Sequence, residues 1–276
     1  EMCIRDRNQE LDNLFGEWIK DYSEHEKQKF CKDGLVYKRL EENSDYDIEE
    51  EWNTAPRKIL FLLKDQNDPG QTDKENQVGS DLRHWLDGDS EICKNNCKIK
   101  GRFIKRIAQL LYLLSYWTPD NNINFEKHVS RKDKIVRDCF NSVPFALVES
   151  KKLIGTSSIS DEVLEKAIEQ DKERLKEELK ILKPNIIVCC GNPQYNYIKG
   201  FYFKDITPDI SINHPYKNDI STKVNCMLDY YSEKGVTVIH SFHPSDRKAN
   251  WITCEKVLSP FKELINNHGI ELKSNR

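Results

Sequence analysis

The sequence lacks a long apolar run, a marked excess of charge of one sign, and the glycine-rich loops of common nucleotide-binding folds. No stretch of its 276 residues approaches the roughly 20 apolar residues that a membrane span requires. Neither G-x-x-x-x-G-K-[ST] nor G-x-G-x-x-G follows a predicted strand. These absences argue against a membrane-spanning protein, a P-loop enzyme and a dinucleotide-dependent enzyme.

Charge and cysteine content exclude fewer classes of protein. A net charge of −3 does not by itself indicate a nucleic-acid-binding protein. Acidic residues gather at 41–51 and basic residues at 98–106, so the uneven charge still allows a positive surface that faces DNA. The nine cysteines are irregularly spaced, which favours a reducing environment over a disulfide framework, and we expect a cytoplasmic protein.

Apolar runs and helical spacing predict the fold class. Short apolar runs predict strands at 58–63, 143–148, 186–190 and 236–239, and helical spacing predicts helices at 8–31, 103–117, 160–182 and 251–267. Strands of continuous apolar residues are typical of a parallel sheet that is covered on both faces. We therefore predict a three-layer α/β/α fold with a central four-stranded parallel sheet.

We expect a single α/β domain over residues 8–276, because neither an internal repeat nor a linker interrupts the pattern. Within it, 8–55 is expected to be an N-terminal helical extension and 71–100 a polar insertion. Residues 1–7 are expected to be a non-native leader.

Chemistry is expected in the loops after the strands, because ligands bind beyond the carboxyl ends of parallel strands. The first predicted strand delivers a carboxylate, Asp65, at its tip, and the last leads into His243-Pro244-Ser245. Between them lies the segment 182–191, with the sequence Leu-Lys-Pro-Asn-Ile-Ile-Val-Cys-Cys-Gly.

These three segments, in this order, resemble motifs of the uracil-DNA glycosylase superfamily over roughly residues 58–260. The resemblance implies a uracil-DNA glycosylase-like fold and a monofunctional DNA glycosylase. Such an enzyme flips a base out of DNA and hydrolyses its N-glycosidic bond, leaving an abasic site. DNA is then the partner, and no cofactor, membrane or obligate protein partner is expected.

The resemblance also implies roles for the strand-end residues. Asp65 would position the attacking water and stabilise positive charge on the sugar, while His243 would stabilise negative charge on the departing base. Ser245, with backbone amides of its loop, would grip a phosphate beside the extruded nucleotide. Arg247 stands near the position where a leucine often fills the vacated base stack.

Further binding residues are expected near the same loops. Lys151 and Lys152 are expected to face DNA phosphates, although a solvated loop explains them equally well. Asn67 is expected to support base binding, in a turn where Asn is common anyway. Trp85 is the nearest candidate for a base-stacking aromatic side chain, with a core or lid position as the alternative.

Glu149 occupies the position, after the second strand, where an Asn commonly reads uracil in this family. A carboxylate only accepts hydrogen bonds, so it suits the amino group of cytosine and disfavours the carbonyl of uracil. We therefore expect a cytosine-type base, modified rather than plain, in repair or anti-phage defence. The alternative is that Glu149 pairs with Lys151 or Lys152.

No metal site is expected, and three other functions stay open. His240 and His243 have a ligand-like spacing but no acidic or cysteine partner, and Cys93 and Cys97 lack a second pair for an iron–sulfur cluster. The open alternatives are a glycosylase with lyase activity, in which Lys64 attacks the sugar, a non-catalytic DNA- or nucleotide-binding module, and an ordinary uracil-excising repair enzyme.

Overall fold

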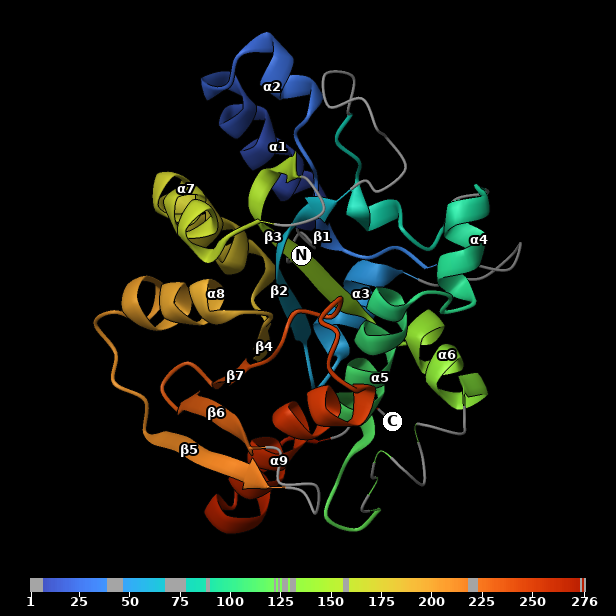
Figure 1. The fold of residues 1–276 in the computed structure, drawn as a ribbon, viewed down its shortest axis with the longest axis vertical. Coiled ribbons are helices and arrows are strands. Elements are labelled where there is room, and N and C mark those ends of the chain that lie inside the picture. Colours follow the sequence, from blue (N-terminus) through green and yellow to red (C-terminus); the bar gives the residue numbers. More distant parts are fainter. Residues whose placement is uncertain are drawn as a thin grey trace, which may run out of the picture.

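The computed structural model describes residues 7–38, 47–67, 78–87, 90–121, 133–155, 159–217 and 223–273, with the single positions 123, 125, 129 and 275. These residues form a seven-stranded sheet with the strand order β1-β3-β2-β4-β7-β6-β5 (Figure 1). The strands are β1 (Gly34–Leu35), β2 (Ile59–Asn67), β3 (Phe145–Gly155), β4 (Ile186–Cys189), β5 (Ile210–Lys217), β6 (Lys223–Tyr231) and β7 (Val236–His240).

The four central strands, β3, β2, β4 and β7, run parallel to one another, which confirms the predicted parallel sheet. Antiparallel strands extend it at both edges: β1 pairs with β3, and the hairpin of β5 and β6 pairs with β7. The hairpin was not predicted because its buried residues, among them Val224, Cys226 and Leu228, alternate with more exposed ones. Such a half-buried strand contains no continuous apolar run.

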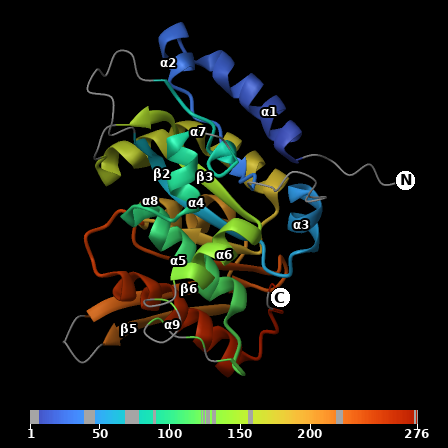
Figure 2. The same cartoon turned by 90° about the vertical axis from the view of Figure 1, so that its right-hand side faces the viewer.

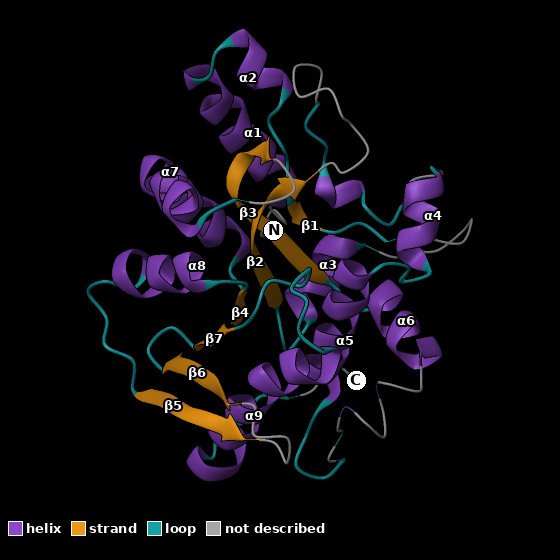
Figure 3. Ribbon diagram, viewed as in Figure 1, coloured by secondary structure: helices purple, strands orange, loops and turns teal. Residues whose placement is uncertain are grey.

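Helices cover both faces of the sheet, so the fold has three layers (Figures 1 and 3). One face carries α5 (Arg102–Tyr116), α6 (Asp133–Ser142) and α9 (Asn250–His268), and Figure 2 shows α5 and α6 in front of the sheet. The other face carries α1 (Arg7–Trp18), α7 (Asp161–Leu182) and α8 (Asn192–Tyr197). The shorter helices are η1 (Ile19–Asp21), α2 (Glu24–Gln28), α3 (Ile48–Thr54), η2 (Leu82–His84), α4 (Glu91–Cys97) and η4 (Ile198–Tyr202). Within the described residues, no helix is long and apolar enough to cross a membrane.

The central strands divide the hydrophobic core into two layers. On β2, Phe61 and Leu63 pack among the residues of α5 and α6, whereas Leu60 and Leu62 pack toward α1 and α7. Successive strand residues point to opposite faces, so a strand covered by helices on both sides must be apolar at every position. This is why the first predicted strand reads as one uninterrupted apolar run.

The N-terminal helices are shorter than the predicted helix 8–31. The helix ends after Trp18 and η1, and α2 restarts with Ser23 as its N-cap. The buried indole N–H of Trp18 donates to Asp171 of α7 at 3.0 Å. Arg7, assigned to the expected leader, begins α1 and forms an ion pair with Glu49 at 2.8 Å. The single-domain organisation stays a prediction.

Candidate active site

A cavity of about 270 Å³ lies on the α5 face of the sheet, over the carboxyl-terminal half of β2 and the neighbouring part of β3, and it is bounded by the start of α5 and the loop after β7. It brings together five predicted site residues: Asp65, Trp85, Glu149, His243 and Ser245. The remaining lining residues are Leu63, Gln66, Leu82, Phe103 and Leu147. Its volume lies near the lower end of the range of about 300–1,000 Å³ that is typical of small-ligand pockets.

Strand register brings the acidic residues of the cavity side by side. Leu63 pairs with Glu149, and Asp65 pairs with Lys151. Since alternate residues of a strand share a face, Asp65, Glu149 and Lys151 all lie on the same side of the sheet. Parallel pairing of β2 and β3 therefore brings the acidic side chains of Asp65 and Glu149 and the ammonium group of Lys151 together on one face of the sheet.

Asp65 is held in a narrow, buried position. Its side chain is 6% exposed, and its Oδ2 atom lies 3.6 Å from the Lys151 ammonium nitrogen. Burial raises the pKa of Asp65 above its ordinary value, and the positive charges of Lys151 and Lys64 partly offset this effect. At Gly155 a Cβ atom would stand 1.6 Å from the same Oδ2, so the carboxylate occupies space that only a glycine leaves open. Gly155 was not among the predicted site residues.

Glu149 is buried in the cavity wall, in surroundings that favour its protonated form. Its side-chain Oε2 has no hydrogen-bond partner among the described residues, and its backbone N–H donates to Asp33 at 2.7 Å. Burial raises the pKa of Glu149 well above its ordinary value, and the nearby carboxylates of Asp33 and Asp65 raise it further. A carboxylic acid has both a donor and an acceptor. A protonated Glu149 could therefore donate as well as accept, and its role in reading the base stays a prediction.

His243 presents a neutral imidazole with a defined tautomer. Its Nδ1 atom accepts a hydrogen bond from the backbone N–H of Ser245 at 3.2 Å, which leaves the proton on Nε2. Burial lowers the pKa of His243 to about 4, and the positive charge of Lys64 contributes in the same direction. At neutral pH the Nε2–H group can therefore donate a hydrogen bond without carrying a charge.

Aromatic side chains form one wall of the cavity. The Trp85 ring lies edge-on to Phe103, with 5.5 Å between ring centroids, and Phe103 lies 5.8 Å from the His243 ring. The sequence analysis named Trp85 but not Phe103, which it used only as the first residue of a predicted helix. An aromatic residue at the start of that helix, facing the strand ends, was the available signal.

Arg106 fixes the loop that carries His243. Its guanidinium donates to the carbonyls of Pro244 at 3.2 Å and Asp246 at 2.5 Å, and its Nε donates to Asn250 at 2.9 Å. Although Arg106 belongs to the basic run at 98–106, it is buried and faces inward. Arg247, in the same loop, is exposed and does not line the cavity.

The prediction that Lys152 contacts a DNA phosphate was wrong. Lys152 is fully buried, and its ammonium nitrogen lies 2.6 and 2.7 Å from the two Asp33 oxygens and 3.0 Å from Glu178. The reason is that β3 continues to Gly155, so alternation turns Lys152 to the face opposite the cavity. Lys151 lies on the cavity side, where its ammonium approaches Asp65 and donates to the Leu153 carbonyl.

Two other expectations concern residues beside the cavity. The side chain of Asn67 lies outside the described residues, so its role stays a prediction. Lys64, the nucleophile of the lyase alternative, does not line the cavity, and its ammonium lies 3.5 Å from Asp161 of α7. This position gives no support to an attack by Lys64 on a sugar bound in the cavity.

The histidine pair does not converge. His240 ends β7 and is buried against the Tyr195 ring at 5.2 Å, whereas His243 faces the cavity. Among the residues that the structure describes, no group of three or more His, Cys, Asp or Glu side chains could hold a metal ion.

Comparison with protein families identifies one match. A family model described as the uracil DNA glycosylase superfamily matches residues 77–266, which is more than half of the chain. The matched region contains Trp85, Glu149 and His243 but begins after Asp65. No curated protein matches the sequence.

Proposed function

This chain belongs to the uracil-DNA glycosylase superfamily, whose members are DNA glycosylases, and we propose that it excises a modified cytosine-type base from DNA. The observation that carries the proposal is the buried carboxyl group of Glu149, whose Oε2 has no hydrogen-bond partner among the described residues, in a cavity shared with Asp65 and His243. A flipped base in this cavity would meet a proton donor, while its sugar would meet a carboxylate.

Asp65 acts on the sugar side of the reaction. Cleavage of the N-glycosidic bond develops positive charge on the sugar, and an ionised carboxylate stabilises that charge. The ammonium of Lys151, 3.6 Å from Oδ2, favours the ionised form. Asp65 also positions the water that attacks C1′ and accepts its proton.

His243 and Glu149 act on the base. The Nε2–H group of His243 donates to the O2 carbonyl, where negative charge develops. The Glu149 hydroxyl donates to N3 of cytosine, and its carbonyl oxygen accepts from the exocyclic amino group. As the N1–C1′ bond breaks, its electron pair passes to the base, and the Glu149 proton moves to N3. The base leaves neutral, and proton exchange with solvent restores Glu149 and Asp65.

The same arrangement stabilises uracil less as a leaving base. Its N3 already carries a hydrogen, so Glu149 can form hydrogen bonds to O4 and to N3–H but cannot protonate N3. The uracil base then leaves as an anion that only hydrogen bonds stabilise. We attribute the preference for cytosine to protonation of the leaving base. The sequence alone had indicated a different cause, namely repulsion between a Glu149 carboxylate and a carbonyl of uracil.

The cavity rim provides the contacts for DNA and for a base modification. The exposed Ser245 and Arg247 follow His243 directly; we assign Ser245 to a flanking phosphate and Arg247 to the gap left by the flipped base. Leu82 and Trp85, from the expected insertion, line the cavity, and we assign them to contacts with a cytosine substituent. We propose anti-phage defence as the biological role, because modified cytosines would distinguish phage DNA from host DNA.

The activity is tested with duplexes that carry cytosine, 5-hydroxymethylcytosine or uracil at one position. After incubation with the protein, strand cleavage is measured with and without hot alkali. We expect cleavage at the modified cytosine only after alkali, as for a monofunctional glycosylase. Cleavage without alkali would support the lyase alternative, and an absence of base release from all three duplexes would support a binding module.

The role of Glu149 is tested by Glu149→Gln, which keeps a donor and an acceptor but carries no transferable proton. Release of the cytosine-type base should fall by about 10²–10⁴-fold, the usual contribution of general acid–base catalysis. Activity requires ionised Asp65 and protonated Glu149, so kcat/KM should rise with pH through the pKa of Asp65 and fall through the raised pKa of Glu149.

In the Gln variant the fall at high pH should disappear, and uracil release should be retained or gained. Glu162→Gln, at an exposed position of α7, is the matched control. A Gln variant with an unchanged rate on modified cytosine and an unchanged pH profile would contradict the assigned role.

A further inference from the structure

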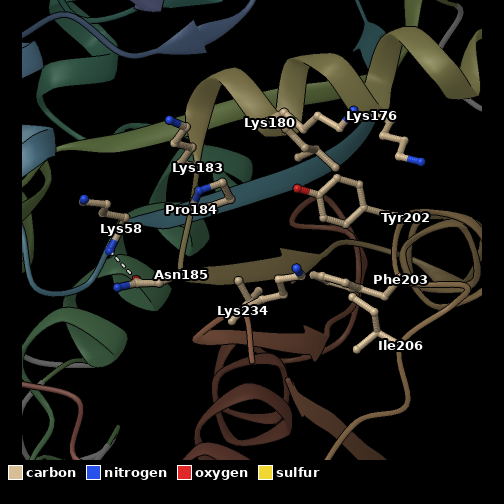
Figure 4. A pocket seen from close by; sticks show the side chains of 12 residues that line it. Lys58, Lys176, Lys180, Lys183, Pro184, Asn185, Tyr202, Phe203, Ile206 and Lys234 are labelled. Atoms are coloured by element: carbon tan, nitrogen blue, oxygen red, sulfur yellow. Dashed lines mark hydrogen bonds between the residues drawn. The ribbon is translucent and has the colours of Figure 1, made fainter. Parts of the chain in front are cut away.

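A second cavity, of about 560 Å³, is drawn in Figure 4. It lies at the amino ends of the parallel strands, whereas the candidate active site lies toward their carboxyl ends. Three of its residues stand at or just before the first residues of parallel strands: Lys58 before β2, Asn185 before β4, and Val236 at the start of β7. The C-terminal end of α7 and helix η4 complete the wall. The active-site residues lie toward the carboxyl ends of the parallel strands. The two cavities are therefore at opposite ends of these strands.

Lysine side chains dominate the polar lining of this cavity. Five of them contribute, and no Asp or Glu among the described residues lines it: Lys58, Lys176, Lys180, Lys183 and Lys234. Lys180 pairs with Glu177 at 2.6 Å and Lys234 with Glu233 at 3.7 Å, but neither carboxylate faces the cavity.

Three of the lysines have no compensating charge close by. Within the described part of the chain, no carboxylate lies within 4.0 Å of the ammonium groups of Lys58, Lys176 or Lys183. Burial lowers the pKa of Lys58, and the positive charges of Arg7 and Lys183 lower it further. A positive charge near a helix C-terminus interacts favourably with the helix dipole, and this explains the presence of Lys180 and Lys183 at the end of α7. It does not account for Lys58 and Lys234, which come from other elements.

The floor of the cavity is apolar and aromatic. Leu179, Phe203 and Val236 are buried beneath it, and the Tyr202 ring stands edge-on to Phe203 with 4.7 Å between centroids. In Figure 4, the Tyr202 ring and the Lys234 side chain lie between α7 and the strand starts. The cavity thus combines several lysine side chains with a surface that suits a flat apolar group.

We propose that this cavity binds a phosphorylated small molecule with an aromatic body, such as a nucleotide. Lysine ammonium groups bind phosphate as point charges, and aromatic rings contact the face of a base. The volume falls within the range of about 300–1,000 Å³ that is typical of small-ligand sites. This site is separate from the cavity in which we place the flipped base, so it does not depend on the proposed glycosylase function.

The proposal is tested by isothermal titration calorimetry of the full chain with the four ribonucleoside triphosphates, pyrophosphate and adenosine. We expect saturable binding of at least one triphosphate, and weaker binding of pyrophosphate and adenosine. Lys183→Gln and Lys234→Gln should each lower the affinity by about tenfold, the value of one charge-assisted hydrogen bond. Lys166→Gln, at an exposed position of α7 that pairs with Glu162 at 2.8 Å, is the matched control and should change nothing.

Two further measurements separate this site from the DNA-binding surface. His243→Ala should retain triphosphate binding, because it alters only the cavity at the other end of the parallel strands. Duplex DNA binding should be unchanged in Lys183→Gln and Lys234→Gln. The proposal is overturned if no triphosphate binds, if the two lysine variants bind as the unmodified protein does, or if His243→Ala abolishes binding. It is equally overturned if the lysine variants weaken DNA binding while no nucleotide binds, which would make this surface a DNA contact.

Discussion

Gly155→Ala should disable the enzyme although Gly155 has no side chain to take part in the chemistry. A Cβ atom at this position would stand 1.6 Å from Oδ2 of Asp65, and real Cβ atoms essentially never approach an atom within 3.0 Å. The two atoms must therefore separate by about 1.4 Å, and the Asp65 side chain can move more readily than the backbone at Gly155. A misplacement of about 1 Å can cost about 10²-fold in rate, so we expect base release to fall by 10²-fold or more.

Single-turnover base release from DNA with a modified cytosine measures this effect, and a double-mutant cycle assigns its cause. If Gly155→Ala acts by displacing Asp65, then adding it to Asp65→Ala should produce little further loss, because the group that it displaces is already gone. Gly200→Ala is the control, since a Cβ atom there meets nothing within 4 Å. Full activity of Gly155→Ala, or losses that multiply in the double variant, would refute the reasoning.

Three further predictions concern single side chains. Asp65→Ala should lower base release by about 10²–10³-fold with DNA binding largely intact, the usual effect of removing one preorganised electrostatic group, and wild-type activity would contradict the assignment. His243→Ala should lower base release to a similar extent and weaken substrate binding; a change in thermal stability alone would make His243 a structural residue. Lys152→Met leaves the buried carboxylates of Asp33 and Glu178 without their cation, so urea unfolding should show a loss of about 3–5 kcal/mol, and an unchanged midpoint would contradict this role.

The parallel core of the sheet could be predicted from sequence because a strand that is buried on both faces is apolar at every position. Each of the central strands β2, β3, β4 and β7 contains a short apolar run, and parallel pairing then brings Asp65, Glu149 and His243 to one cavity. The edge hairpin of β5 and β6 was missed because one half-exposed face breaks its apolar pattern.

The errors at the site arise from contacts that depend on three-dimensional packing. The apolar run of the second strand ends at Val148, whereas β3 continues to Gly155, so Lys152 was assigned to a loop and its buried carboxylate partners went unnoticed. The raised pKa of Glu149 depends on burial and on Asp33, which is 116 residues away in the chain. Arg106 was grouped with surface cations because it lies outside the apolar spacing of its helix, and the loop carbonyls that it binds are about 140 residues away in the chain.

The most direct test of the central claim is base release by the unmodified protein from three DNAs: phage DNA with modified cytosine, the same phage DNA with ordinary cytosine, and DNA that contains uracil. Our account predicts release of the modified base, with little or no release of uracil, because Glu149 can protonate N3 of a cytosine but not of a uracil. Robust uracil excision, with no release from the modified phage DNA, would contradict the account and make the chain an ordinary uracil-excising repair enzyme.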